Sequence, residues 1–72
     1  MAMALFEVRV DCHDELPCRI FWEDGRSWNI IRVLHSCKSE TDFEGIRYTV
    51  KIGSVVKYIY RIRDRWYVDR VP

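Results

Sequence analysis

The sequence contains no long apolar run and no export signal. No window approaches the roughly 18 consecutive apolar residues that a membrane-spanning helix needs. The opening residues, Met1-Ala2-Met3-Ala4, lack the charged segment and the apolar stretch that a secretory signal combines. We therefore expect no membrane association and a location in the cytoplasm.

Cysteine is scarce and odd in number, with only Cys12, Cys18 and Cys37. An odd count in a chain without a signal peptide argues against a disulfide framework. Together with His13 and His35, these cysteines have the side chains of a zinc site. However, five residues separate Cys12 from Cys18, and the single residue between His35 and Cys37 is too short a spacing for a zinc knuckle. We therefore expect no bound metal.

Catalytic motifs are also missing. The sequence has no glycine-rich phosphate loop, no metalloprotease helix and no nucleophile elbow. A carboxylate pair such as Asp14 and Glu15, or a cysteine with a histidine, needs a concave, water-excluding pocket to act as a catalyst. A β domain of 72 residues fills its interior with its own side chains. We predict that the protein is not an enzyme and binds no cofactor.

Aromatic residues, in contrast, are abundant, with three Trp, four Tyr and three Phe. A chain of 72 residues forms a single domain, over 1–72. It buries only about 60% of its unfolded surface, so large rings matter for its stability. Hydrophobic residues make up 49% of the sequence and charged residues 32%, which is typical of a globular domain.

Short alternating segments indicate β-strands, and no segment shows a helical period. Strands are predicted over residues 6–10, 19–23, 26–35, 46–52, 55–62 and 65–71, with loops at 12–17 and 36–45. Asp24-Gly25 predicts a type I′ hairpin turn, and Gly53-Ser54 and Arg63-Asp64 mark two further turns.

The strand predicted over 26–35 changes phase along its length. Its apolar positions switch from Trp28 and Ile30 to Ile31 and Val33, which favours a β-bulge or a sharp bend between two halves of a small barrel. The predicted fold class is therefore all-β: a small antiparallel barrel or strongly bent sheet of five to six strands, SH3-like at a coarse level. Closing such a sheet would also remove exposed strand edges.

The segment from Ile46 to Arg63 alternates apolar or aromatic residues with basic ones. Because strand side chains alternate between two faces, one face is expected to be apolar and the other positive. The expected inward set is Tyr48, Val50, Ile52, Val56, Tyr58, Tyr60 and Ile62. The expected outward set is Arg47, Thr49, Lys51, Lys57, Arg61 and Arg63. The predicted core is Phe6, Val8, Val10, Ile20, Trp22, Trp28, Ile30, Val33, Tyr48, Val50, Ile52, Tyr58, Tyr60, Trp66 and Val68.

One combination of motifs covers most of the chain, from about residue 16 to 71. It joins a Trp/Gly/Arg hairpin (Trp22, Gly25-Arg26, Trp28), a Val33-Leu34 strand and a closing hairpin that runs from Tyr58-Ile59-Tyr60-Arg61 to Trp66 and Arg70-Val71. This combination resembles a family of small bacterial all-β domains of unknown function. The resemblance implies an all-β domain of bacterial origin. It implies no catalytic residues, because none is established for that family.

The outward cations form a candidate nucleic-acid surface. Residues 1–45 carry five Lys/Arg against nine Asp/Glu, whereas residues 46–72 carry seven against two, so a net charge of +1 hides a positive second part. The candidate binding residues are Arg47, Lys51, Lys57, Arg61 and Arg63, with Tyr67 as a ring on which a base could stack. The competing interpretation is a solvated sheet face that keeps the protein soluble and protects strand edges. Both interpretations remain open.

Two phenylalanines are candidates for a protein interface. Phe21 lies out of phase with its apolar neighbours, and Phe43 lies in an otherwise acidic segment, where it could instead cap the mouth of the barrel. The predicted function is a non-catalytic interaction module with an unidentified protein partner in a bacterial cytoplasm. The alternative is a nucleic-acid-binding module that uses the basic face over residues 46–63. We expect a monomer, or a weak homodimer in which the acidic segment meets the basic face.

Overall fold

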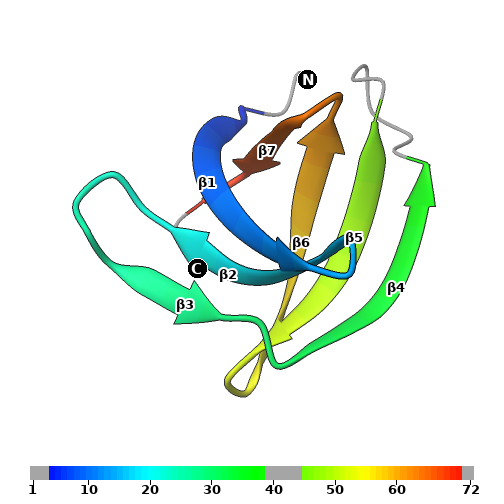
Figure 1. The fold of residues 1–72 in the computed structure, drawn as a ribbon, viewed down its shortest axis with the longest axis horizontal. Coiled ribbons are helices and arrows are strands. Elements are labelled where there is room, and N and C mark those ends of the chain that lie inside the picture. The colour runs from blue at the N-terminus through cyan, green and yellow to red at the C-terminus, as the bar shows by residue number, and fades with distance from the viewer. Residues whose placement is uncertain (1–3, 39–44, 71–72) are drawn as a thin grey trace.

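The computed structural model describes residues 4–38 and 45–70, and these residues form strands and turns only (Figure 1). The strands are β1 Phe6–His13, β2 Leu16–Phe21, β3 Ser27–Asn29, β4 Arg32–Lys38, β5 Ile46–Ile52, β6 Val55–Ile62 and β7 Arg65–Val68. They form one antiparallel sheet in the order β3-β2-β1-β7-β6-β5-β4. Within the described ranges, no helix is long and apolar enough to cross a membrane. The all-β prediction is confirmed.

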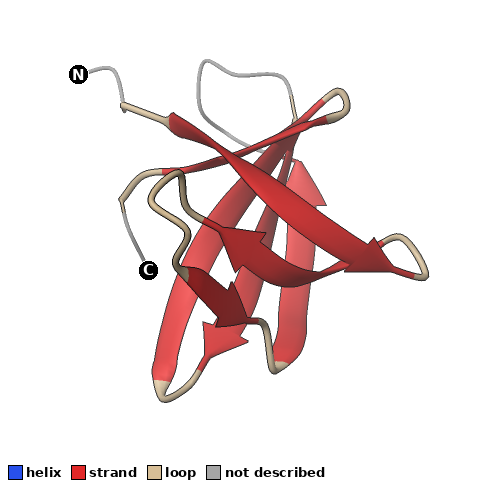
Figure 2. Ribbon diagram, turned by 60° about the vertical axis from the view of Figure 1, so that its left-hand side comes forward, coloured by secondary structure: helices blue, strands red, loops and turns tan. Residues whose placement is uncertain are grey.

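Strand β1 belongs to both halves of the sheet. Its residues 6–8 pair with β7, and its residues 9–13 pair with β2. The sheet curls, and the hairpin of β1 and β2 crosses in front of the wall formed by β4, β5 and β6 (Figures 1 and 2). Ile20 of β2 accordingly belongs to the same buried cluster as Val50 of β5 and Ile59 of β6.

The two edge strands, β3 and β4, are consecutive in the chain. The amide of Ile30 donates to the carbonyl of Cys18 in β2 at 2.9 Å, and the amide of Ile31 donates to the carbonyl of Lys51 in β5 at 2.8 Å. Successive residues therefore bond to opposite ends of the sheet. This confirms the break predicted between Ile30 and Ile31, and Val33 faces the core as predicted, whereas Ile31, also predicted to point inward, is 64% exposed. Because the strand breaks there, the sheet has seven strands among the described residues, rather than the five to six predicted.

The first hairpin loop is shorter than predicted. Strands β1 and β2 pair as far as His13 and Leu16, so the loop contains only Asp14 and Glu15 instead of residues 12–17. Both loop residues have positive φ, 50° and 67°, as a type I′ turn requires. Pro17 is buried within β2 beside a register irregularity, where a residue without an amide hydrogen is tolerated.

The turn at Asp24-Gly25 is present, but its predicted type is wrong. The amide of Gly25 donates to the carbonyl of Trp22 at 3.1 Å, and the amide of Trp22 donates to the carbonyl of Arg26 at 2.8 Å. The loop therefore contains three residues, of which only Gly25 has positive φ (94°). This arrangement is typical of a type I turn followed by a left-handed glycine. The bond from the Arg26 amide to the Asp24 carboxylate, 3.0 Å long, is the main cause of the lowered pKa of Asp24.

The turn at Gly53-Ser54 determines which residues of β6 face the core. It contains two residues and pairs Ile52 with Val55, and the same register pairs Val50 with Lys57. Directly paired residues on antiparallel strands point to the same face of the sheet. Because Val50 is fully buried, Lys57 also lies on the core face.

Strand β6 is therefore inverted relative to the prediction. Lys57, Ile59 and Arg61 share the core face, whereas Tyr58 and Tyr60 point to the outward face together with Val56 and Ile62. Tyr58 is 43% exposed. Tyr60 is buried, but it lies outside the central cluster because it is on the other side of the sheet.

The core lies between the two halves of the curled sheet. Its buried residues are Val8, Ile20, Tyr48, Val50, Ile59, Trp66 and Val68, and Val10, Trp22, Ile30, Val33 and Ile52 pack against them. The core prediction is wrong for Phe6 and Tyr58, which are exposed, and it omitted the fully buried Ile59. Trp28, also predicted as core, is half-buried.

Candidate functional site

The predicted basic face is split between the two sides of the sheet. Arg47 and Lys51 of β5 point outward as predicted, whereas Lys57 and Arg61 of β6 lie on the core face. Arg63 is exposed in the turn between β6 and β7, with a φ of 60°. The prediction that these five cations share one face is therefore wrong, because it rested on the wrong phase for β6.

Lys57 and Arg61 also have partners within the protein. The Lys57 ammonium lies 3.3 Å from the Asp69 carboxylate, and only 9% of the Lys57 side chain is exposed. Arg61 donates from Nε to the carbonyl of Arg63 at 3.1 Å, and its guanidinium lies 5.5 Å from the centroid of the Trp66 ring. Neither cation is free to follow a phosphate backbone.

Arg47 is held on the outward face. Its guanidinium lies 4.5 Å from the centroid of the Tyr58 ring, and its Nη2 donates to the Cys37 sulfur at 3.7 Å. Its Nε is buried and has no hydrogen-bond partner among the described residues. Arg47 therefore packs as a cation on a ring rather than projecting into solvent.

Tyr67, the predicted stacking ring, lies on the outward face opposite Tyr60 and is half-buried. Burial and the nearby Asp69 carboxylate raise the pKa of Tyr60, and Arg47 lowers it by a smaller amount. Of the predicted nucleic-acid set, the outward face thus holds Arg47, Lys51 and Tyr67.

The two predicted interface phenylalanines have different outcomes. The Phe21 ring is half-buried on the outside of β2, where the guanidinium carbon of Arg9 lies 3.8 Å from its centroid and that of Arg19 lies 6.0 Å away. Arg19 also donates from Nε to the side-chain oxygen of Asn29 at 2.8 Å. Phe43 lies outside the residues that the structure describes.

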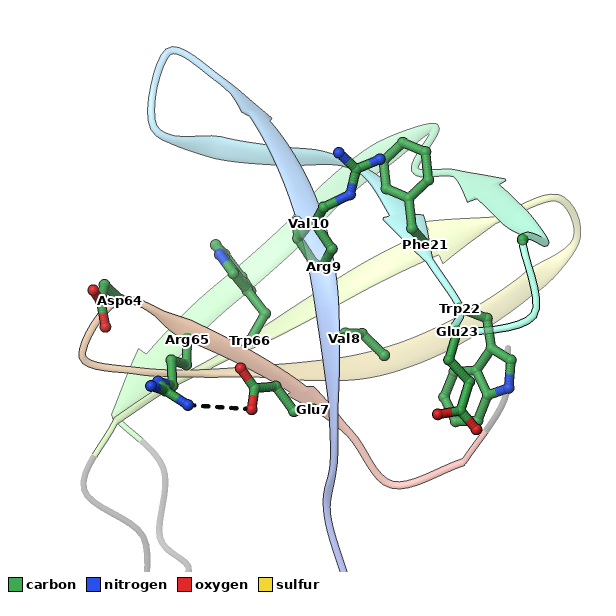
Figure 3. A pocket seen from close by; sticks show the side chains of 11 residues that line it. Glu7, Val8, Arg9, Val10, Phe21, Trp22, Glu23, Asp64, Arg65 and Trp66 are labelled. Atoms are coloured by element: carbon green, nitrogen blue, oxygen red, sulfur yellow. Dashed lines mark hydrogen bonds and ion pairs between the residues drawn. The ribbon is translucent and has the colours of Figure 1, made fainter.

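A groove of about 720 Å³ opens where β1 changes partners. Because β1 pairs with β7 only as far as Val8 and with β2 only from Arg9, each side of β1 lacks a paired strand over part of its length. The residues that line this β1 groove are Glu7, Val8, Arg9, Val10, Phe21, Trp22, Glu23, Gly25, Asp64, Arg65 and Trp66. Figure 3 shows β1 crossing the groove, with Arg65 and Trp66 on one side of the strand and Trp22 and Glu23 on the other.

The charged residues of the β1 groove are Glu7, Arg9, Glu23, Asp64 and Arg65. Arg65 pairs with Glu7 at 3.4 Å, and the Arg9 guanidinium lies against the Phe21 ring. Within the part of the chain that the structure describes, no hydrogen bond or ion pair reaches Glu23 or Asp64. Both arginines therefore have a contact within the domain, whereas two of the three carboxylates have none among the described residues.

A smaller hollow of about 270 Å³ continues from the β1 groove. Leu5, Phe6, Glu7, Trp22 and Glu23 line it, and we refer to it as the ring hollow. The centroids of the Phe6 and Trp22 rings lie 6.2 Å apart, and the ring planes form an angle of 67°. This edge-to-face arrangement is a preferred geometry for two aromatic side chains.

The sequence-based site prediction included Phe21 but missed the rest of the β1 groove. Phe6 and Trp22 were assigned to the core on the alternation of their strands; Phe6 is exposed, whereas Trp22 packs against the core and also lines the ring hollow. A signal was available, since Phe6 begins the first apolar strand and Trp22 directly precedes a turn. Rings at strand ends lie at the margin of a small sheet, where partner strands no longer cover them.

No group of three His, Cys, Asp or Glu that could hold a metal ion occurs in residues 4–38 and 45–70. Cys12 and Cys18 are exposed, Cys37 is half-buried, and all three are free thiols. Burial is the largest cause of the raised pKa of Cys12, and Arg61 opposes it.

A scan of protein-family models finds none that matches the chain, and searches of curated proteins and of solved structures find no match either. The resemblance to small bacterial all-β domains thus stays a prediction. The function has to be argued from the β1 groove and its residues.

Proposed function

We propose that the protein is a non-catalytic interaction module that binds an extended segment of a partner protein along the β1 groove. The observation that carries this proposal is the position of the groove. It lies at the partner change of β1, where the Phe21, Trp22 and Trp66 rings line one depression. Aromatic side chains in concave, partly desolvated positions supply much of the binding energy of protein interfaces.

The shape of the groove favours an extended segment. The ring hollow shares Glu7, Trp22 and Glu23 with the β1 groove, so the two form one continuous depression. Extended peptides commonly bind in aromatic-lined grooves or along unpaired strand edges. We also propose that the curled sheet is SH3-like, a class of small domains in which aromatic-lined grooves hold proline-rich segments.

The charges in the groove favour a protein over nucleic acid. Three carboxylates and two arginines line it, and both arginines already contact other groups of the domain. A phosphate backbone needs several accessible cations along one surface. The alternative, a nucleic-acid-binding module, would have to use Arg47, Lys51 and Tyr67 on the outward face, without Lys57 and Arg61.

The test is to select peptides from a displayed library of random short peptides and to titrate a selected peptide into the ¹⁵N-labelled domain. We expect the backbone amide signals of residues 5–10, 21–25 and 64–66 to shift, while those of residues 47–51 stay in place. A single-stranded oligonucleotide titrated at low salt is the matched comparison. Failure to select any binder, peptide-induced shifts confined to residues 47–51, or tighter binding of the oligonucleotide would each overturn the proposal.

A further inference from the structure

We infer that the ring hollow is a binding site for a cationic side chain, the guanidinium of Arg or the ammonium of Lys, supplied by the bound partner. The inference rests on the proposed function only for the source of that side chain. The chemistry of the hollow is argued separately, from its rings, its charges and its size.

Aromatic rings and arginine side chains lie together at several other places in this protein. An arginine guanidinium lies within 6.0 Å of the centroids of four rings: Phe21, Trp28, Tyr58 and Trp66. Energetically significant cation–π pairs occur roughly once per 70–80 residues in proteins, so this short chain is unusually rich in them. Pairing of rings with cations is therefore a recurrent feature of its surface.

The Phe6–Trp22 pair departs from this pattern. Among the described residues, no guanidinium or ammonium lies over either ring, and the lining of the ring hollow contains no basic residue. Phe6 is nonetheless 50% exposed, and Trp22 is half-buried. A cation from outside the chain would give this pair what those four rings obtain from within it.

The charge around the two rings is negative. Glu7 and Glu23 both line the ring hollow, and no intramolecular partner reaches Glu23 in the described part of the chain. Glu7 pairs with Arg65, but more than half of each side chain is exposed, at 53% and 65%. Ion pairs between exposed groups are weak, so Glu7 can be shared with an incoming cation.

The size of the ring hollow fits one side chain. Pockets for drug-sized ligands or cofactors occupy roughly 300–1,000 Å³. The ring hollow, at about 270 Å³, lies below that range and suits a single side chain. The larger β1 groove next to it would hold the backbone and the flanking residues of the same segment.

The test uses small probes first, so that it does not depend on finding the partner. n-Butylguanidinium chloride is titrated into the ¹⁵N-labelled domain, with n-butanol as the neutral comparison and sodium chloride holding the ionic strength constant. The indole N–H signals of the tryptophans are the readout. We expect the Trp22 signal to shift with the guanidinium probe and not with butanol. The Trp28 signal is the internal control, because Trp28 lies outside the lining of the hollow.

Two carboxamide variants complete the probe experiment. Glu23→Gln should weaken guanidinium binding about three- to tenfold, the loss expected for one charge-assisted contact of a cation near an aromatic ring. Glu15→Gln, in the exposed turn at the far end of the β1–β2 hairpin, should leave it unchanged. Equal shifts with both probes, or a Glu23→Gln domain that binds like the wild type, would overturn the inference.

A selected peptide then separates this inference from the proposed function. Replacing each Lys or Arg of that peptide with Gln, one at a time, should identify one position whose loss weakens binding about three- to tenfold and reduces the Trp22 shift. If every replacement leaves both unchanged while the groove amides still shift, the cation site is wrong and the peptide groove stands. If no peptide moves any groove amide but the guanidinium probe binds, the proposed function fails and the cation site stands.

Discussion

The outward face of β5 and β6 differs from the ring hollow beside the β1 groove in how cations lie relative to aromatic rings. On the outward face, Arg47 of one strand lies over Tyr58 of the next, so the cation and its ring belong to the same chain. In the ring hollow, the Phe6 and Trp22 rings lie beside Glu7 and Glu23 without a cation of their own among the described residues. The difference indicates that the first surface is complete by itself, whereas the second has an unmet preference for a positive group.

The cause of this difference lies in strand pairing. Strand β5 is paired along its length with β4 on one side and β6 on the other, so each outward side chain has neighbours on both sides. Strand β1 exchanges β7 for β2 between Val8 and Arg9, and each side of it loses a neighbour there. A change of partner within a small sheet therefore leaves side chains without a neighbouring strand to contact.

The largest expected effect is the difference in stability loss between a substitution in the core and one in the ring hollow. Trp66→Ala should destabilise the domain by about 3–5 kcal/mol, because Trp66 is buried and packs on Tyr48, with ring centroids 5.3 Å apart. Phe6→Ala should cost less than about 1.5 kcal/mol, since Phe6 is half-exposed and its full burial would be worth only about 1.5–3 kcal/mol. Urea denaturation followed by circular dichroism measures both. Similar losses for the two variants would contradict the distinction between core and ring hollow.

The next effect tests the orientation of β6. Ile59→Ala should cost about 2–5 kcal/mol, because Ile59 is fully buried, whereas Val56→Ala should change the stability by no more than about 0.5 kcal/mol. The same urea denaturation experiment applies. A costly Val56→Ala with a harmless Ile59→Ala would restore the opposite orientation and return Lys57 and Arg61 to solvent.

Strands β5 and β6 show how far the sequence can predict the fold. In β5 the core side carries Tyr48 and Val50, so alternation alone orients the strand correctly. In β6 both faces contain apolar or aromatic residues, and the basic residues suggest the wrong side. The length of the turn between β5 and β6 determines the orientation of β6 instead. A two-residue loop pairs the residue before it with the residue after it, so even positions on β5 must share a face with odd positions on β6.

The break between Ile30 and Ile31 was predictable for a related reason. Ile30 and Ile31 are adjacent apolar residues that cannot both point inward along one regular strand, and they bond to opposite ends of the sheet. The β1 groove was not predictable in the same way. Its position depends on where β1 changes partners, and the regular alternation of Phe6, Val8 and Val10 contains no sign of that change.

A smaller difference is expected between the coupling energies of two ion pairs: Lys57–Asp69 on the core side of the sheet, and Arg65–Glu7 at the β1 groove. A double-mutant cycle with Lys57→Gln and Asp69→Asn should give a coupling energy of about 1–2 kcal/mol, because the Lys57 side chain is only 9% exposed. The corresponding cycle with Arg65→Gln and Glu7→Gln should give less than about 0.5 kcal/mol, since both side chains are more than half exposed. Equal coupling energies would remove the argument that Glu7 is available to a partner.

The smallest effect concerns alkaline pH and the outward face. Burial raises the pKa of Tyr60 above its ordinary value of 10.0, so the folded protein keeps this phenol protonated after the unfolded chain has lost the proton. The free energy of unfolding should therefore fall as the pH rises through about 10, and less steeply in Tyr60→Phe. Urea midpoints over that range measure the slope, with Tyr58→Phe as the exposed control. If the free energy of unfolding falls equally steeply with pH in the wild type and in Tyr60→Phe, Tyr60 is not the buried phenol with the raised pKa.

The central claim is that the β1 groove and its ring hollow form the binding surface of this domain. The most direct measurement is a set of isotope-edited nuclear Overhauser contacts between a selected peptide and the labelled protein. We expect contacts from a Lys or Arg side chain of the peptide to the rings of Phe6 and Trp22, and from neighbouring peptide residues to Phe21 and Trp66. Contacts to Val56 and Tyr58, which are exposed residues of β6 on the outward face, would contradict the account.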